Sequence, residues 1–238
     1  MSDLPDRITV AVRTFWAARD KQIAAQRAEG RRDAGLRGAV TGGKQMDGFL
    51  TLAVDLLEAV GVPESWIRAG SEMELPGFYR PTKEWDLLVV SRGQLLAALE
   101  VKSQVGPSFG NNFNNRTEEA LGSAVDLWTA FREGAFGASV QPWLGYLFLL
   151  EDSTRSQSPV AVKEPHFHVF PEFQRASYAK RYELLCRKLV LERQYTAAAF
   201  LMTSREEASA GGYTEPARDI SVARLVKSMV WAVREHLE

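Results

Sequence analysis

The residues best suited to chemistry lie at the ends of two adjacent apolar runs. Asp86 precedes the first run, and Glu100 and Lys102 end the second. Side chains two positions apart on a strand share one face, so Glu100 and Lys102 point together while Val101 points into the opposite layer. Charged groups at the end of an apolar strand have two explanations: an ordinary ion pair at the solvent border, or a reactive site.

The pairing of these two runs as a β-hairpin decides whether Asp86 joins that face. A loop of three or five residues centred on Gly93 makes paired positions sum to 186, which sets Asp86 opposite Glu100 and Glu84 opposite Lys102. A two-residue loop makes the sum 185 and sends Asp86 to the other face. We therefore expect an odd loop, in which Gly93 adopts the positive φ of such turns.

Two carboxylates that meet on a strand pair repel each other unless a cation lies between them. Oxygen ligands of this kind suit Mg²⁺ or Mn²⁺, here held by Asp86, Glu100 and the Val101 carbonyl. Lys102 can then position a water molecule while the metal neutralises charge on a phosphodiester. The predicted chemistry is phosphodiester hydrolysis. A third acidic ligand stays open, the candidates being Asp47, Asp55, Glu58, Glu72 and Glu84.

The bulk composition is compatible with one nuclease-sized domain. The 238 residues are 45% hydrophobic, enough for one sizeable core. We expect that core at about residues 45–152, with a helical, basic segment before it (1–44) and further elements after it (160–238). Cys186 is the only cysteine, which excludes an internal disulfide. No apolar run reaches membrane-spanning length and no signal peptide begins the chain, so a cytoplasmic location is expected.

The charge is unevenly distributed although the net charge is only −1. Residues 13–44 hold eight basic and three acidic side chains, and residues 175–193 hold six and two. The net charge argues against a protein that coats nucleic acid nonspecifically. Both basic segments could line a DNA cleft, or could simply be solvated helix faces.

The order of predicted elements is that of an α/β fold. Hydrophobic periodicity predicts helices, strands and helices in an order that suits a mixed central sheet flanked by helices, with extra N- and C-terminal helices. Asn115 and Glu118 form a capping-box pattern at the start of the middle helix. The predicted helices are 7–29, 45–60, 116–132, 173–194 and 222–237, and the predicted strands are 72–79, 84–90, 95–102, 143–150 and 195–202.

The spacing Asp86, thirteen residues, Glu100, one residue, Lys102 resembles the PD-(D/E)XK nuclease motif, with Trp85 where the motif usually has Pro. The stretches 103–120 and 42–49 are similar to the XhoI family of type II restriction endonucleases. This resemblance implies a restriction-endonuclease-like core that cleaves double-stranded DNA at the palindrome CTCGAG. It also implies Mg²⁺, which Mn²⁺ can replace, a homodimer, and a cognate DNA methyltransferase as a genetic partner.

Polar residues directly after the catalytic strand are the candidates for DNA recognition. Asn amides can pair with adenine and Arg with guanine in the major groove, and a segment in this position must lie near the scissile phosphate. Turn formation and helix capping are the competing roles for the asparagines. Gln104, two residues beyond Lys102, is a candidate for holding water or phosphate. The full set of DNA-binding candidates is Lys44, Gln104, Asn111, Asn112, Asn114, Asn115 and Arg116.

Two other functions stay open on the sequence alone. A PD-(D/E)XK enzyme can serve DNA repair or junction resolution, and a DNA-binding module can carry acidic residues that are only structural. Incubation of a plasmid with the protein and Mg²⁺ separates the three: discrete fragments, a smear, or intact DNA of shifted mobility.

Overall fold

The computed structural model describes residues 3–28 and 43–237, and its centre is a five-stranded mixed sheet. The strand order is β1-β4-β5-β6-β7; β1, β4 and β5 run antiparallel, whereas β5, β6 and β7 run parallel. The predicted α/β class and mixed sheet are confirmed. The strands are β1 (Ile67–Arg68), β4 (Leu87–Ser91), β5 (Gln94–Gln104), β6 (Trp143–Glu151) and β7 (Ala197–Thr203).

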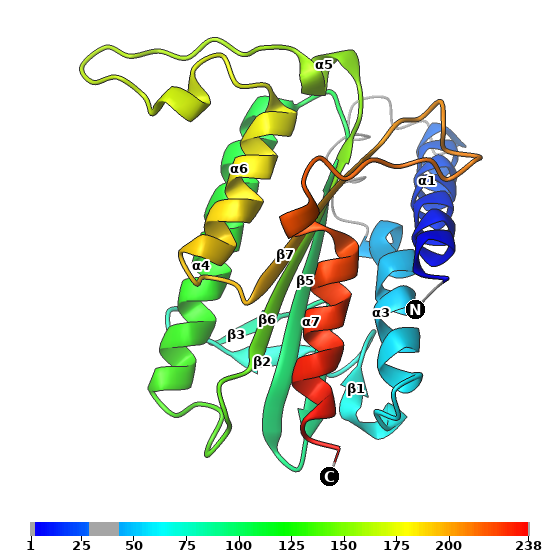
Figure 1. Cartoon of the computed structure of the whole chain (residues 1–238), viewed down its shortest axis with the longest axis vertical. Helices are drawn as coiled ribbons and strands as arrows, with labels where there is room; N and C mark the ends of the chain where they lie inside the picture. Colours follow the sequence, from blue (N-terminus) through cyan, green and yellow to red (C-terminus); the bar gives the residue numbers. More distant parts are fainter. Residues whose placement is uncertain (1–2, 29–42, 238) are drawn as a thin grey trace.

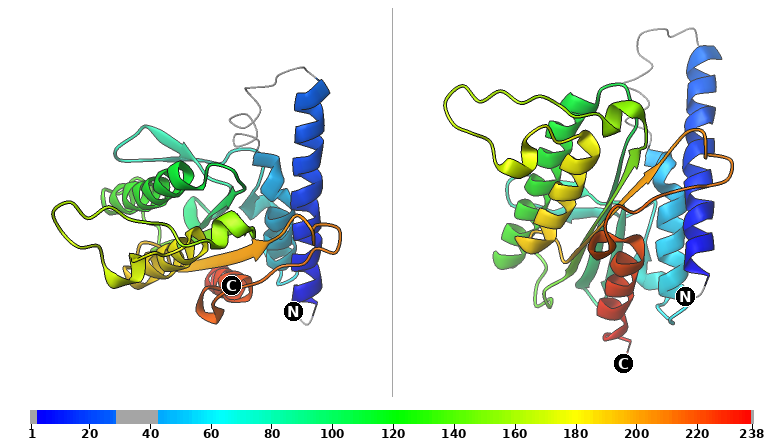
Figure 2. Two further views of the ribbon diagram at one scale, coloured as in Figure 1. Left: turned by 90° about the horizontal axis from the view of Figure 1, so that it is seen from above. Right: turned by 45° about the horizontal axis from the view of Figure 1, so that its top comes forward.

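Helices cover both faces of the sheet (Figure 1). Helices α4 (Phe109–Arg132) and α6 (Tyr178–Leu191) lie on one face, and α1 (Leu4–Ala28), α3 (Asp47–Glu58) and α7 (Val222–Arg234) lie on the other. Figure 2 shows these two layers from above. Each layer buries its own apolar cluster against the sheet, which is why β6, an inner strand covered on both faces, is apolar along almost its whole length. None of the described helices combines the length and apolar character needed to cross a membrane.

The β4–β5 hairpin differs from the predicted one in its turn but not in its pairing near Asp86. The turn has two residues, Arg92 and Gly93, both at positive φ (51° and 75°), the geometry of a tight hairpin turn. The expected odd loop is therefore wrong. A β-bulge between Val89 and Val90 then shifts the register by one, so Leu87 pairs with Leu99. The bulge supplies the extra residue that was expected in the loop.

The segment before β4 forms a separate two-stranded ribbon of β2 (Glu74–Pro76) and β3 (Thr82–Glu84). Glu84 pairs with Glu74 there, so the expected pairing of Glu84 with Lys102 is wrong. The turn of the ribbon is held by the buried carboxylate of Asp126 in α4, which accepts hydrogen bonds from the Phe78 and Tyr79 backbone N–H groups at 2.7 and 2.8 Å. The ribbon consequently lies beside α4 (Figure 2).

Helix α4 begins at Phe109, two turns earlier than predicted, and the expected capping box at Asn115 is wrong because Asn115 lies inside the helix. The other long helices and strands lie near their predicted places. The remaining short elements are η1 (Gly43–Met46), η2 (Glu64–Trp66), α5 (Thr154–Gln157), η3 (Pro171–Phe173) and η4 (Arg218–Ile220).

Candidate active site

The site lies where β5 extends beyond β4. Pairing of the two strands ends at Leu87 and Leu99, whereas β5 continues to Gln104. The Asp86 N–H still donates to the Leu99 carbonyl (3.2 Å), and the Asp86 carboxylate accepts the Val101 N–H (2.8 Å). Because the N–H and C=O of one strand residue point to the same side, the Val101 carbonyl faces this open edge as well.

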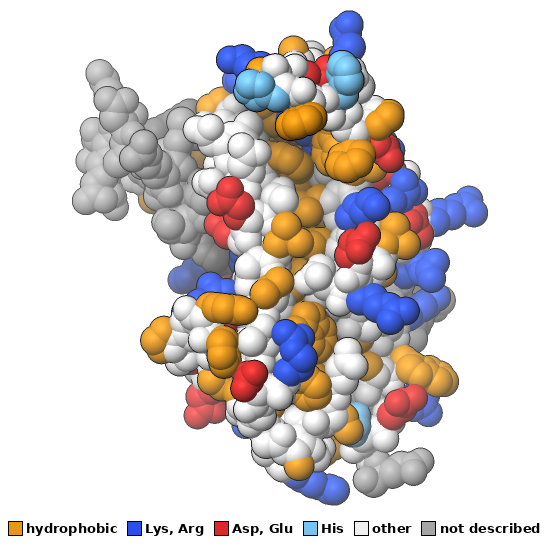
Figure 3. Space-filling model, turned by 90° about the vertical axis from the view of Figure 1, so that its left-hand side faces the viewer, with side chains coloured by type: hydrophobic (Ala, Val, Ile, Leu, Met, Phe, Trp, Pro, Cys, Tyr) orange, Lys and Arg blue, Asp and Glu red, His pale blue; other side chains and the backbone are white. Residues whose placement is uncertain are grey.

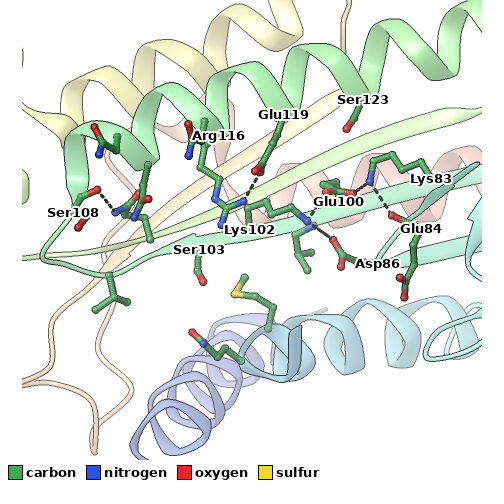
Figure 4. Close-up of a pocket in the computed structure, with 18 of the residues that line it drawn as sticks. Lys83, Glu84, Asp86, Glu100, Lys102, Ser103, Ser108, Arg116, Glu119 and Ser123 are labelled. Carbon is green, nitrogen blue, oxygen red and sulfur yellow. Dashed lines mark hydrogen bonds and ion pairs between the residues drawn. The ribbon is translucent and has the colours of Figure 1, made fainter. Parts of the chain in front are cut away.

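The structure brings Asp86, Glu100 and Lys102 together. Lys102 Nζ lies 3.2 Å from Asp86 Oδ2 and also contacts Glu100 Oε1, so one ammonium bridges both carboxylates. Glu100 is buried, and its second oxygen, Oε2, lies 2.7 Å from Lys83 Nζ. Figure 4 shows these four side chains converging from β3, β5 and the residue before β4. Lys83 was not among the residues predicted from the sequence.

The two carboxylates have opposite pKa shifts although they are neighbours. Burial and the charge of Glu100 raise the pKa of Asp86, and the nearby Lys102 and Val101 N–H offset only part of that increase. Burial alone would raise the pKa of Glu100 too, but the two lysine ammoniums outweigh it and lower that pKa. Burial would lower the pKa of Lys102, yet the carboxylates of Glu100 and Asp86 raise it. Glu100 and Lys102 therefore stay charged at neutral pH.

This donor set fits a hard divalent cation. Two carboxylates and a strand carbonyl face one point, and the ammonium of Lys102 already bridges the carboxylates as a cation would. Among the described residues, no cluster of three His, Cys, Asp or Glu side chains surrounds this point. Of the acidic side chains considered as third ligands, Glu84 lines the same cleft, whereas Asp47, Asp55, Glu58 and Glu72 do not.

A cleft of about 950 Å³ opens over the site, between α4 on one side and α1 with η1 on the other. One wall is a stripe of α4 side chains at helical spacing: Asn112, Arg116, Glu119 and Ser123 lie four, three and four residues apart. Figure 4 shows Arg116, Glu119 and Ser123 directed from this helix toward β5. The asparagines before Arg116, which the predicted helix left out, thus belong to the same helix as the rest of this wall.

The recognition candidates divide according to that helix face. Asn111 and Asn115 line the cleft beside the stripe, one helical turn apart. Asn114 is exposed but does not line the cleft, because its position on the helix turns it away. Lys44, in η1, is also exposed outside the cleft lining.

Gln104 lines the cleft but is nearly fully buried, and its amide is already engaged. The Tyr182 hydroxyl donates to Gln104 Oε1 (2.9 Å), and Gln104 Nε2 donates to the Ser108 carbonyl (3.4 Å). These bonds tie the end of β5 to α6 and to the start of α4.

The opposite wall contains residues that the sequence did not single out. Arg19 of α1 and Gln45 of η1 line it, with the Arg19 guanidinium 3.5 Å from Gln45 Oε1. Arg19 is nearly fully buried. The sequence alone could not show which side of α1 faces the cleft, because that depends on how the helix packs. The first basic segment therefore reaches the cleft through Arg19, and its residues 29–42 lie outside the described part of the chain.

The second basic segment does not line the cleft. It lies largely on α6, where acidic partners neutralise much of it: Arg187 contacts Glu183 and Asp219, and Lys180 lies 3.1 Å from Glu183. Figure 3, which views the face made by α4 and α6, shows acidic side chains beside the basic ones. Of the two readings left open for this segment, the structure favours a solvated helix face, because none of its basic residues lines the cleft.

A mixed sheet covered by helices on both faces, with an acidic cluster at the open edge of β5, is consistent with the restriction-endonuclease-like fold class. The family model described as restriction endonuclease XhoI matches residues 25–215. The chain therefore belongs to the XhoI family of restriction endonucleases, as its motifs indicated.

Three similar proteins are named type II restriction enzymes. The type II restriction enzyme BstVI of Geobacillus stearothermophilus is 56% identical over 84% of this chain and 91% of its own length. XhoI of Xanthomonas vasicola is 48% identical over 79% and 76%, and AbrI of Azospirillum brasilense is 49% identical over 70% and 75%. No solved structure matches the chain significantly.

Proposed function

We propose that this protein is a Mg²⁺-dependent type II endonuclease that hydrolyses double-stranded DNA at the palindrome CTCGAG. The observation that carries the proposal is the convergence of Asp86, Glu100 and Lys102 at the open edge of β5, beneath a polar helix face. Membership of a family of restriction endonucleases supports the DNA substrate, and the name XhoI among the relatives supports the site expected for that family.

In this proposal Asp86, Glu100 and the Val101 carbonyl hold Mg²⁺, with Mn²⁺ as a substitute. The bound cation supplies charge neutralisation at the phosphodiester. Lys102, on the same strand face as Glu100, orients the attacking water toward the phosphorus. Asp86 keeps its orientation through the Val101 N–H, so the two carboxylates stay directed at one point.

For recognition, we propose that α4 presents Asn111, Asn112, Asn115 and Arg116 to base edges or phosphates. These side chains line the cleft within two turns of one helix, a geometry that suits major-groove contacts. Gln104 supports this wall by fixing the end of β5. Lys44 and Asn114, which lie outside the cleft lining, would contact phosphates at its periphery.

A palindromic site is matched by a two-fold symmetric dimer in which each protomer cuts one strand, and we propose that assembly here. The last helix and residues 173–194 are the candidate interfaces; each has a large exposed apolar side chain, Trp231 (69% exposed) on α7 and Leu191 (70%) at the end of α6. A cell with this activity requires a methyltransferase of the same specificity, as a genetic partner.

The proposal is tested with two plasmids that differ only in one CTCGAG site. We expect a single cut at that site with Mg²⁺, none with EDTA, and none in the plasmid whose site carries one changed base pair. Sequencing the ends locates the scissile bonds. Fragments at a different site would refute CTCGAG, a smear would indicate a nonspecific or repair nuclease, and a mobility shift without cleavage would indicate a DNA-binding module.

A further inference from the structure

A second lysine, Lys83, is built into the carboxylate cluster. Its Nζ donates to Glu100 Oε2 at 2.7 Å and to the Glu84 carbonyl at 2.9 Å, and lies 4.3 Å from the centre of the Trp85 ring. The side chains of Lys83 and Glu100 are only 11% and 6% exposed. Three contacts of different kinds thus fix one ammonium beside the carboxylate.

We propose that Lys83 is a positioning residue that holds the carboxylate of Glu100 in its metal-binding orientation. This inference rests on the proposed function of the same site. The two oxygens of Glu100 have separate partners: Oε1 contacts Lys102, on the Asp86 side, and Oε2 contacts Lys83. Lys83 thereby fixes the carboxylate plane so that Oε1 faces Asp86.

Fixation of Glu100 matters because Lys102 cannot both hold a carboxylate and position a water. If Asp86 and Glu100 held the cation, it would supply the positive charge that Lys102 now gives them, and Lys102 would be free to position the water. Glu100 then keeps one fixed partner, Lys83, on the oxygen that does not face Asp86. Without Lys83, the carboxylate can rotate with Lys102 and lose its alignment.

Trp85 explains how a lysine is retained at this buried position. It is itself buried and replaces the Pro of the nuclease motif, and its ring face lies beneath the Lys83 ammonium. A cation–π contact of this kind stabilises the ammonium, and the more so where water is excluded. The departure from the motif is therefore linked to the second lysine, two residues earlier on the chain.

The test compares Lys83→Met, Lys83→Gln and Lys83→Arg with the wild type in steady-state cleavage of a duplex containing CTCGAG. We expect Lys83→Met and Lys83→Gln to lower kcat by about 10–100-fold with little change in the KM for DNA, as loss of a group that orients a metal ligand does. Lys83→Arg, which keeps the charge and the stacking on Trp85, should recover most of the loss. Lys163→Met is the charge-matched control, because Lys163 is exposed and does not line the cleft.

A second readout needs no DNA. Mg²⁺ titration followed by thermal unfolding should give a half-saturating concentration about tenfold higher in Lys83→Met than in the wild type. A lower concentration would show that Lys83 only repels the cation and would overturn the proposal. A kcat of Lys83→Met equal to that of the wild type would also overturn the proposal. So would a loss of kcat that Lys83→Arg does not recover, if the unfolding midpoints of Lys83→Met and Lys83→Arg fall by the same amount. If Lys83→Met is unfolded, Lys83→Gln decides; and if the wild type itself does not cleave, the proposed function fails instead.

Discussion

Replacement of Lys102 by Met tests whether its ammonium occupies the position of the proposed metal ion. At 3.2 Å from Asp86 Oδ2, with an effective dielectric constant of 20, the gross Coulomb attraction is about 5 kcal/mol. Desolvation of the ammonium opposes it, and because the two side chains are 23% and 29% exposed we take about 3 kcal/mol, the lower end of the range for buried pairs, as the net loss. In a domain of this size that corresponds to a Tm lower by about 6–12 °C in EDTA.

Mg²⁺ should repair this loss of stability without restoring cleavage. A cation at one hundred times its Kd stabilises the folded state by about 2.7 kcal/mol, nearly the amount lost. In the wild type the gain should be smaller, because the cation must first displace Lys102 from Asp86 and Glu100. Thermal unfolding of both proteins with EDTA and with saturating Mg²⁺, without DNA, measures the difference. An equal or larger metal response in the wild type would refute the reasoning, and addition of Asp86→Asn to the variant should abolish its response.

Three further results are expected. Asp126→Asn should lower the free energy of unfolding by about 2 kcal/mol, since its amide would direct a donor at Arg80 Nε, now 2.6 Å from the carboxylate. Burial alone would raise the pKa of Asp126, but the Tyr79 N–H, Arg80 and the Phe78 N–H outweigh it and lower that pKa. The difference in urea midpoint between the wild type and Asp126→Asn should therefore be complete above pH about 3.9 and shrink as pH falls through the lowered pKa. Deletion of Leu96 should remove the bulge but preserve the pairing near Asp86, so cleavage persists while stability falls by about 1.5–3 kcal/mol; a folded but inactive protein would show that the bulge itself shapes the site. Asn112→Ala should weaken binding of a site-containing duplex in Ca²⁺ by about 1–3 kcal/mol, measured by fluorescence anisotropy, and Asn114→Ala much less; equal effects would contradict a cleft-facing role.

The meeting of Asp86, Glu100 and Lys102 could be predicted from the sequence because the apolar positions of both strands favour the pairing that brings them together. Leu87 and Leu99 are both buried in the cluster under α1, α3 and α7. The pairing of these two residues therefore buries their side chains and also places Asp86 beside Glu100. The turn was predicted wrongly because loop length was taken as the only control of register. Leu96 and Ala97 are consecutive yet buried in the same cluster, which only a bulge permits. Three adjacent apolar residues at the start of β5 do not reveal which of them is the extra one.

The first part of the polar wall, residues 111–115, was left outside the predicted helix because asparagine favours turns and helix caps. Packing outweighs that preference: Phe109 stacks on Tyr178 at 5.8 Å between ring centres, and Phe113, one turn later, meets Tyr182 edge-on at 5.1 Å. The spacing of the two phenylalanines was the available signal. Arg19 could not be found in this way, because its place at the cleft depends on how a distant helix docks.

The hairpin that carries the two proposed metal-binding carboxylates also has consequences for the order of folding. Asp86 and Glu100 are fourteen residues apart in sequence, and hairpins of this length close within microseconds. The cleft above them has one wall from α4 and another from α1, a helix that begins at Leu4, and bringing such distant parts of the chain to one sheet is costly in chain entropy and slow. We therefore expect a newly made chain to bring its carboxylates together before it has a groove that can receive DNA. Assembly of that groove, more than formation of the carboxylate pair, would set the moment at which the chain becomes able to cut.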